Sequence, residues 1–137
     1  MGIFDKLFGK KRKDKLEEHK PIPDQDQDSG YEPIPRYPGS VMIRHSVDST
    51  SSAAKRKVYI EYECMGRFDA PAYWYMDQME SSGWKLEAWS PPRIINRDLS
   101  GTTGFISLVY NKEKKRCDIG TKYRTSHTKI WIDYKEY

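Results

Sequence analysis

The sequence predicts an α+β fold, a mostly antiparallel β-sheet in the order β-β-α-β-β-β-β with one helix packed on a face. Two observations predict it. Residues 69–84 form the one well-delimited stretch in which apolar residues recur at helical spacing. On both sides of this stretch, short segments alternate between apolar and polar residues, as half-buried strands do. A disordered arm and linker precede this domain.

Composition divides the chain into three parts. Residues 1–20 are a basic amphipathic arm, with seven Lys/Arg against four Asp/Glu, net +3. Residues 21–38 are rich in proline and aspartate and poor in large aliphatic side chains, so we expect a disordered linker. Residues 39–137 form the α+β domain, and a chain of 137 residues has room for one such domain plus a tail.

The predicted helix is delimited at both ends. Asp69 is the expected N-cap, because its carboxylate can accept a hydrogen bond from a free N–H of the first turn. Pro71 fits that first turn, where no N–H partner is needed. Gly83 is the expected C′ residue, after which Trp84 starts a strand. An apolar stripe runs along the helix and consists of Ala72, Met76, Met79 and Gly83.

Six strands are predicted from alternation. They cover residues 41–47, 58–64, 84–90, 105–111, 117–123 and 128–134. In the first strand, Met42, Arg44 and Ser46 are expected to share a face. In the second, Glu61 and Glu63 fall on the polar face and are expected to be solvated. Because one helix cannot cover six strands, part of the sheet should be exposed or should meet a partner.

The N-terminal arm carries bulky apolar residues beside basic ones. The apolar residues fall on one face of a short helix, and a basic run follows them; the residues are Ile3, Phe4, Leu7, Phe8, Lys10, Lys11, Arg12 and Lys13. Such a segment fits the interface of an anionic membrane. It also fits a groove on a partner protein, and a frayed terminus without a role is the third interpretation. We predict a membrane- or partner-docking segment.

Two further basic clusters lie in predicted hairpin loops, which are expected at the same end of the sheet. With exposed aromatic residues on the strands, they would form a stacking surface for single-stranded nucleic acid. Ordinary solubilising turns explain the same clusters more simply. The basic residues are Lys55, Arg56, Lys57, Lys112, Lys114, Lys115 and Arg116, and the aromatic residues are Tyr59, Trp89, Tyr110 and Trp131. The net charge of +4 is a mild bias towards acidic partners.

No catalytic constellation is readable in the sequence. There is no nucleophile–base pair and no glycine-rich phosphate loop after a strand, so we expect neither an enzyme nor a cofactor. Cys64 and Cys117 form no CxxC pair and are expected to be buried reduced thiols, with a single disulfide between neighbouring strands as the alternative. His45 and His127 could complete a zinc site with them only if distant strands converged, so no metal is expected.

The sequence favours a protein that is not exported. No stretch reaches the roughly 20 apolar residues of a membrane-spanning helix, and the N-terminus lacks the pattern of a signal peptide. We therefore expect a cytoplasmic protein that lies on the inner face of the membrane if its arm meets lipid. A protein partner or larger complex is the expected partner, with an anionic membrane surface or nucleic acid as the alternatives.

Three groups of residues carry a resemblance. Residues 34–40 read IPRYPGS before the first strand, and residues 73–84 span the end of the helix. The late strands contribute Leu108, Tyr110, Cys117, Ile119, Ile130 and Ile132. Over residues 34–134 this pattern resembles a loosely defined set of small prokaryotic domains of unknown function, some of them attached to lipoproteins. The resemblance implies an α+β sandwich without catalytic residues. The chain lacks the lipobox cysteine of the lipoprotein versions, and its amphipathic arm takes that place, which favours the membrane interpretation.

Overall fold

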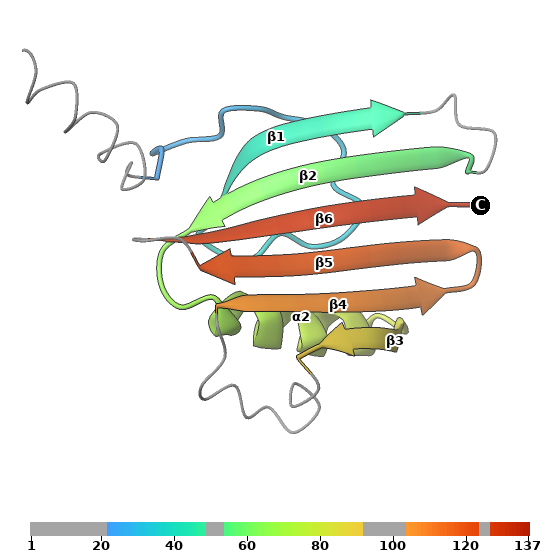
Figure 1. The fold of residues 1–137 in the computed structure, drawn as a ribbon. Coiled ribbons are helices and arrows are strands. Elements are labelled where there is room, and N and C mark those ends of the chain that lie inside the picture. Colours follow the sequence, from blue (N-terminus) through green and yellow to red (C-terminus); the bar gives the residue numbers. More distant parts are fainter. Residues whose placement is uncertain (1–21, 49–53, 92–103, 124–126) are drawn as a thin grey trace, which may run out of the picture.

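A computed structural model describes residues 22–48, 54–91, 104–123 and 127–137. They form a six-stranded sheet in the order β1-β2-β6-β5-β4-β3, and all neighbouring strands are antiparallel (Figure 1). The strands are β1 (Val41–Asp48), β2 (Arg56–Cys64), β3 (Lys85–Ser90), β4 (Phe105–Lys112), β5 (Lys115–Tyr123) and β6 (Thr128–Glu136). Among the described residues α2 (Asp69–Ser81) is the one helix. The α+β class is confirmed, with the sheet as its larger part.

The C-terminal end of α2 is as predicted, and its N-terminal end is not. Gly83 has a φ of 87° and takes the C′ position, where Trp84 donates its backbone N–H to the Met79 carbonyl oxygen at 2.9 Å. The expected N-cap is wrong, because Phe68 occupies that position and makes no side-chain capping bond. Asp69 lies inside the first turn and pairs with Arg67 at 3.1 Å. Its charge still favours the positive end of the helix dipole.

One face of the sheet packs on α2. The helix contacts β3, β4 and β5, and it buries Ala72, Tyr75, Met76 and Met79 against them. The facing side of β4 presents Ile106, Leu108 and Tyr110, none of which is exposed. Tyr110 is therefore a core residue, and the prediction that it belongs to an exposed stacking surface is wrong. Its alternation with the buried leucine and isoleucine places it on the covered face.

Residues 22–38 complete the cover of the same face. In Figure 1 they start along the outer edge of β1 and then pass behind β1, β2 and β6, on the same side of the sheet as α2. Ile34 is buried in the core, and the backbone N–H of Tyr37 donates to the hydroxyl oxygen of Tyr75 at 3.2 Å. The ring of His45 lies against Gly30, where a Cβ would come within 2.2 Å of it. The expected disordered linker is therefore corrected for residues 22–38, which form an ordered strap across the sheet.

Charged hydrogen bonds hold this strap in place. Arg36 pairs with both Glu32 and Asp26 at 2.8 Å, and its guanidinium stacks on the ring of Tyr62. The Tyr62 hydroxyl donates to Glu32 at 2.6 Å. Burial alone would raise the pKa of Glu32, but the bonds from Arg36 and Tyr62 outweigh it, and the pKa is lowered. A polar segment orders here because its acids find specific partners, which composition alone does not show.

The strap also closes the outer edge of β1. The carboxylate of Asp26 accepts the backbone N–H of Met42 at 2.8 Å, and that of Asp28 accepts the N–H of His45 at 2.9 Å. Unpaired N–H donors on an edge strand invite pairing with another chain, and here two carboxylates accept their hydrogen bonds.

The register of β1 against β2 shifts between Met42 and Arg44. Such a bulge turns Met42 to the core and Arg44 to the opposite face, so the prediction that they share a face is wrong.

Candidate functional site: the open face of the sheet

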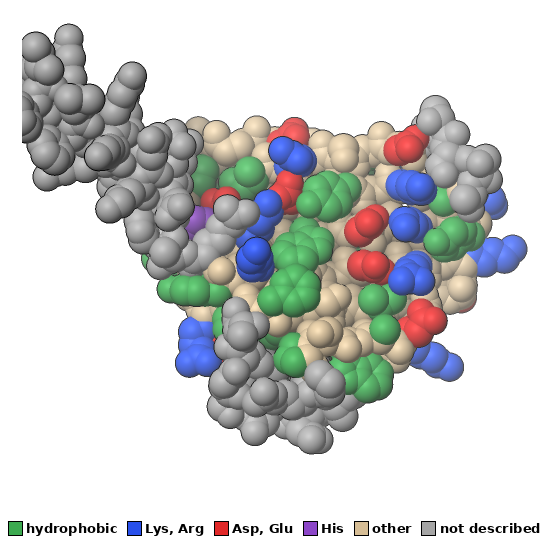
Figure 2. All heavy atoms as spheres, viewed as in Figure 1, with side chains coloured by type: hydrophobic (Ala, Val, Ile, Leu, Met, Phe, Trp, Pro, Cys, Tyr) green, Lys and Arg blue, Asp and Glu red, His purple; other side chains and the backbone are tan. Residues whose placement is uncertain are grey.

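The face opposite α2 and the strap is open among the described residues, and Figure 2 views the molecule from this side. Hydrophobic side chains gather over the middle of the sheet, with charged side chains around them (Figure 2). A shallow depression of about 440 Å³ lies here. Its lining residues are Tyr59, Phe105, Ser107, Asp118, Ile119, Lys122, Lys129, Trp131 and Asp133.

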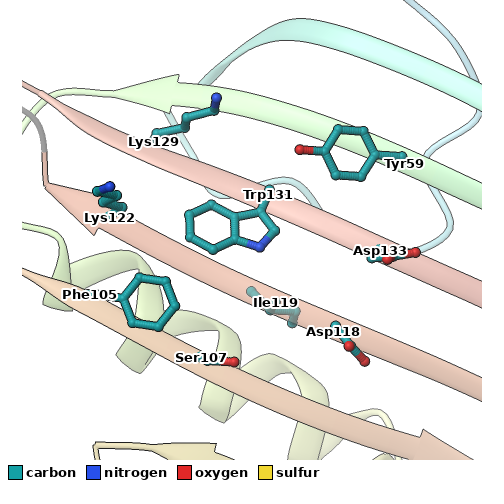
Figure 3. A pocket seen from close by; sticks show the side chains of 9 residues that line it. All are labelled: Tyr59, Phe105, Ser107, Asp118, Ile119, Lys122, Lys129, Trp131 and Asp133. Atoms are coloured by element: carbon teal, nitrogen blue, oxygen red, sulfur yellow. The ribbon is translucent and has the colours of Figure 1, made fainter.

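Three aromatic residues cross the open face diagonally. Tyr59 comes from β2, Trp131 from β6 and Phe105 from β4 (Figure 3). The rings of Phe105 and Trp131 lie 5.6 Å apart with 34° between their planes. The indole lies flat across Gly120, where a Cβ would come within 2.0 Å of it. Because Gly120 has no side chain, the indole lies close to the sheet and the centre of the face does not protrude.

Charged pairs lie on both sides of the Gly120–Trp131 pair. Lys122 of β5 stands opposite Lys129 of β6, two residues from the Gly120–Trp131 pair in one direction along the strands. Two residues in the other direction, Asp118 stands opposite Asp133. Figure 3 shows the lysines on one side of the indole and the aspartates on the other. Like charges directly opposite each other destabilise an antiparallel pair, so β5 and β6 carry an unfavourable pair on each side of the central Gly120–Trp131 pair.

Glu61 is buried on this face, with 5% of its surface exposed. Its carboxylate pairs with Arg44 at 3.3 Å and makes a closer ion pair with Lys129. The prediction that it is solvated is therefore wrong, because residues on both neighbouring strands cover it. Burial, and next the charge of Glu61, raise the pKa of Tyr59. Glu63 is part-exposed and contacts His127 at 3.5 Å.

The predicted basic clusters divide between the two faces. Lys57 and Arg116 share a cross-strand row with Lys135 on the open face. Arg56 instead stacks on Tyr31 of the strap, and the Lys112 ammonium donates to the carbonyl oxygen of Ser82 at the end of α2. The remaining cluster members are Lys55, which precedes β2, Lys114, which lies in the β4–β5 turn, and Lys115, which starts β5. The two hairpins do lie at the same end of the sheet (Figure 1).

Sequence reasoning named Tyr59 and Trp131 but missed the rest of this site. Trp89, also named, stands opposite Leu108 at the edge of the covered side. Phe105, Asp118 and the lysines of β5 and β6 follow from alternation within each strand once the register is known. The docking residues of the arm, from Ile3 to Lys13, lie outside the described residues.

The cysteines and histidines do not assemble into one site. Cys64 is level with Thr128 of β6 and Cys117 with Tyr134, so six residues, roughly 20 Å, separate them along the sheet. Both are buried free thiols, and burial raises the pKa of Cys64 to about 11. Within the described ranges, no group of three or more His, Cys, Asp or Glu side chains could hold a metal ion.

Comparisons with known proteins give one match. The chain is 36% identical over 98 residues to an uncharacterized protein of Archaeoglobus fulgidus. The match covers 72% of this chain and 30% of the archaeal protein, so the chain spans less than a third of that protein's length. No family model and no solved structure match the chain. The expected resemblance to a prokaryotic domain of unknown function is confirmed to this extent.

In the part of the chain that the structure describes, no helix is long and apolar enough to cross a membrane.

Proposed function

We propose that this chain is a non-catalytic binding or accessory protein whose interaction surface is the open face of the sheet. The observation that carries the proposal is the aromatic strip on this face, in which Tyr59 and Trp131 are half-buried and Phe105 is 40% exposed. Aromatic residues are enriched at interfaces because each contributes a large apolar area. The similar segment of the archaeal protein lies within a longer chain, as a module that works beside other domains would.

The open face also has the form of a binding surface rather than of a reaction site. The depression is shallow, and the strongly buried thiols lie on the other side of the sheet. Burial raises the pKa of both Cys64 and Cys117, which removes the thiolate that a nucleophile needs. The most buried charge of the face, that of Glu61, is neutralised by ion pairs with Arg44 and Lys129.

In this proposal the N-terminal arm holds the domain on an anionic membrane surface or on a partner protein. The support is the sequence pattern of the arm, four bulky apolar residues followed by four basic ones. Each basic residue near an anionic surface contributes about 1 kcal/mol. The chain would then work in the cytoplasm, attached to the inner face of the membrane.

Co-sedimentation of the full chain with anionic and neutral vesicles tests this attachment. The double variant Phe4→Asp/Phe8→Asp should lose sedimentation with anionic vesicles, because two carboxylates cannot enter the acyl boundary. Phe4→Leu/Phe8→Leu keeps the apolar face and should sediment as the unchanged chain does. Equal sedimentation of the aspartate variant would refute membrane attachment through the arm, and circular dichroism would show that the domain stays folded.

A second candidate function, binding of single-stranded nucleic acid, is favoured by one observation. Lys57, Lys135 and Arg116 form a basic row on the same face as Tyr59 and Trp131. Phosphates could contact the row while bases stack on the rings. Anisotropy of a labelled oligonucleotide should then rise with protein, and the affinity should fall steeply with salt. A salt-independent signal, or none with DNA and RNA, would dismiss this candidate.

A further inference from the structure

On β5 and β6, the charges nearest the Gly120–Trp131 pair on the open face are arranged symmetrically about it. Along β5 the order is Asp118, Gly120, Lys122, and along β6 it is Asp133, Trp131, Lys129 when read in the same direction across the sheet. Both strands therefore place an acid and a base at equal distances, about 7 Å, from the central pair. The pattern is self-complementary, since a half-turn about the central row exchanges the acids with the bases.

We propose that the occupant of the open face is a second copy of this chain, bound face to face with its two-fold axis over the Gly120–Trp131 row. The axis lies between the sheets and across the strands. Each Lys122 then faces the Asp118 of the other copy, and each Lys129 faces its Asp133. In a two-fold interface every contact occurs twice, so two charge pairs become four. The inference rests on the proposed function only in taking the open face as the interaction surface.

The monomer gives a physical reason for this arrangement. Lys122 beside Lys129, and Asp118 beside Asp133, are like-charge neighbours on adjacent strands. Asp118 pairs with Arg116 and Lys129 with Glu61. In the part of the chain that is described, Lys122 and Asp133 have no ion pair. A second copy would bring an opposite charge to each of the four side chains and offset both unfavourable pairs.

Shape and area also fit a second sheet. The indole of Trp131 lies flat because Gly120 has no side chain, so the centre of the face is low enough for close approach. Sheets pack about 10 Å apart, a gap that a lysine and an aspartate can bridge together. Six strands of about eight residues give a face of roughly 750 Å². A standard interface buries about 800 Å² on each partner.

The nearly balanced charge favours a copy of the chain over a nucleic acid. The basic row of Lys57, Lys135 and Arg116 lies directly beside the acidic pair of Asp118 and Asp133. A polyanion that followed the basic row would pass over these carboxylates and be repelled. In the two rows that flank Gly120 and Trp131, a second copy meets each charge of β5 and β6 with its opposite. Such complementarity sets orientation and excludes other partners.

Sedimentation velocity of the full chain, with two single variants and their mixture, tests the proposal. Asp118→Lys and Lys122→Asp each place like charges across the interface, so each alone should weaken dimerisation on the order of a hundredfold. Mixed in equal amounts, the two variants should form a heterodimer, since every interface position again joins opposite charges. Within one chain each substitution replaces a like-charge pair across the strands with an opposite one. Asp118→Lys also removes the ion pair with Arg116, but this pair is exposed and contributes little, so folding should not suffer.

The outcomes separate the alternatives. A dimeric parent chain, two monomeric variants and a dimeric mixture would support the proposal. A monomeric parent chain, or variants that dimerise as well as the parent, would overturn it. Binding of a single-stranded oligonucleotide by a monomeric parent would also overturn it and favour the second candidate function. The Phe4→Asp/Phe8→Asp variant should remain dimeric, so a failure of the arm and a failure of the dimer can be told apart.

Discussion

The two faces of the sheet are built from the same six strands and differ in almost every other respect. One face is covered by α2 and by the strap of residues 22–38, and its side chains are apolar and buried. The other face carries aromatic rings among charges of both signs and has no cover among the described residues (Figure 2). Because side chains alternate along a strand, each strand serves both purposes at once. The covered face stabilises the fold, and the open face is the surface that we propose for binding.

The largest difference between the faces should appear on truncation of neighbouring residues in β4. Leu108 is fully buried, so Leu108→Ala removes packed atoms and leaves a cavity that costs about 2–5 kcal/mol. Val109, the next residue, points to the open face, and Val109→Ala should cost less than about 1 kcal/mol. Urea denaturation of both variants measures this. Equal losses would contradict the contrast between the two faces.

A smaller effect is expected where the open face is itself closely packed. Gly120→Ala introduces a Cβ where the Trp131 indole now lies, so the ring must move, at a cost of about 1–3 kcal/mol. In a Trp131→Ala background, Gly120→Ala should change the free energy of unfolding very little, because no indole ring is left to displace. A double-mutant cycle by urea denaturation gives the coupling. An unchanged cost in that background would show that the strain lies in the backbone instead.

The smallest effect should come from the edge of β1. Hydrogen bonds from Arg36 and from the backbone of Met42 lower the pKa of Asp26 below its ordinary 3.8, and backbone bonds lower that of Asp28. A group whose pKa is lower in the folded state stabilises it above the unfolded pKa and loses this effect as pH falls through the folded value. Asp26→Asn should therefore flatten the loss of stability below about pH 4. Denaturation midpoints between neutral pH and pH 3 measure it, and an unaltered slope would count against this role.

Sequence reasoning succeeded where the information was local. Each strand was predicted from alternation, and its ends differ from the observed ones by no more than two residues. The end of α2 followed from the φ that Gly83 can adopt. The strap was missed because its order comes from a few long-range bonds, such as those of Arg36 and Asp26, while its composition resembles that of a disordered segment.

The candidate site was only partly predictable, for a related reason. Tyr59 and Trp131 are recognisable as aromatic residues on a polar strand face. That Lys122 stands opposite Lys129 depends on the register of β5 against β6, and no single strand contains that information. The burial of Glu61 likewise arises from side chains of both neighbouring strands.

The route of the strap gives the protein a defined mechanical response. Tension applied to the N-terminal arm would reach the contacts of Asp26 and Asp28 with β1 first, and then the Arg36–Glu32 pair. These bonds would break one after another. Meanwhile the hydrogen bonds between the strands would carry force only at the β1 edge of the sheet. Peeling residues 22–38 from the sheet would lengthen the tether by roughly 55 Å. Such a chain yields to a pull on its N-terminal end before the sheet itself bears the force.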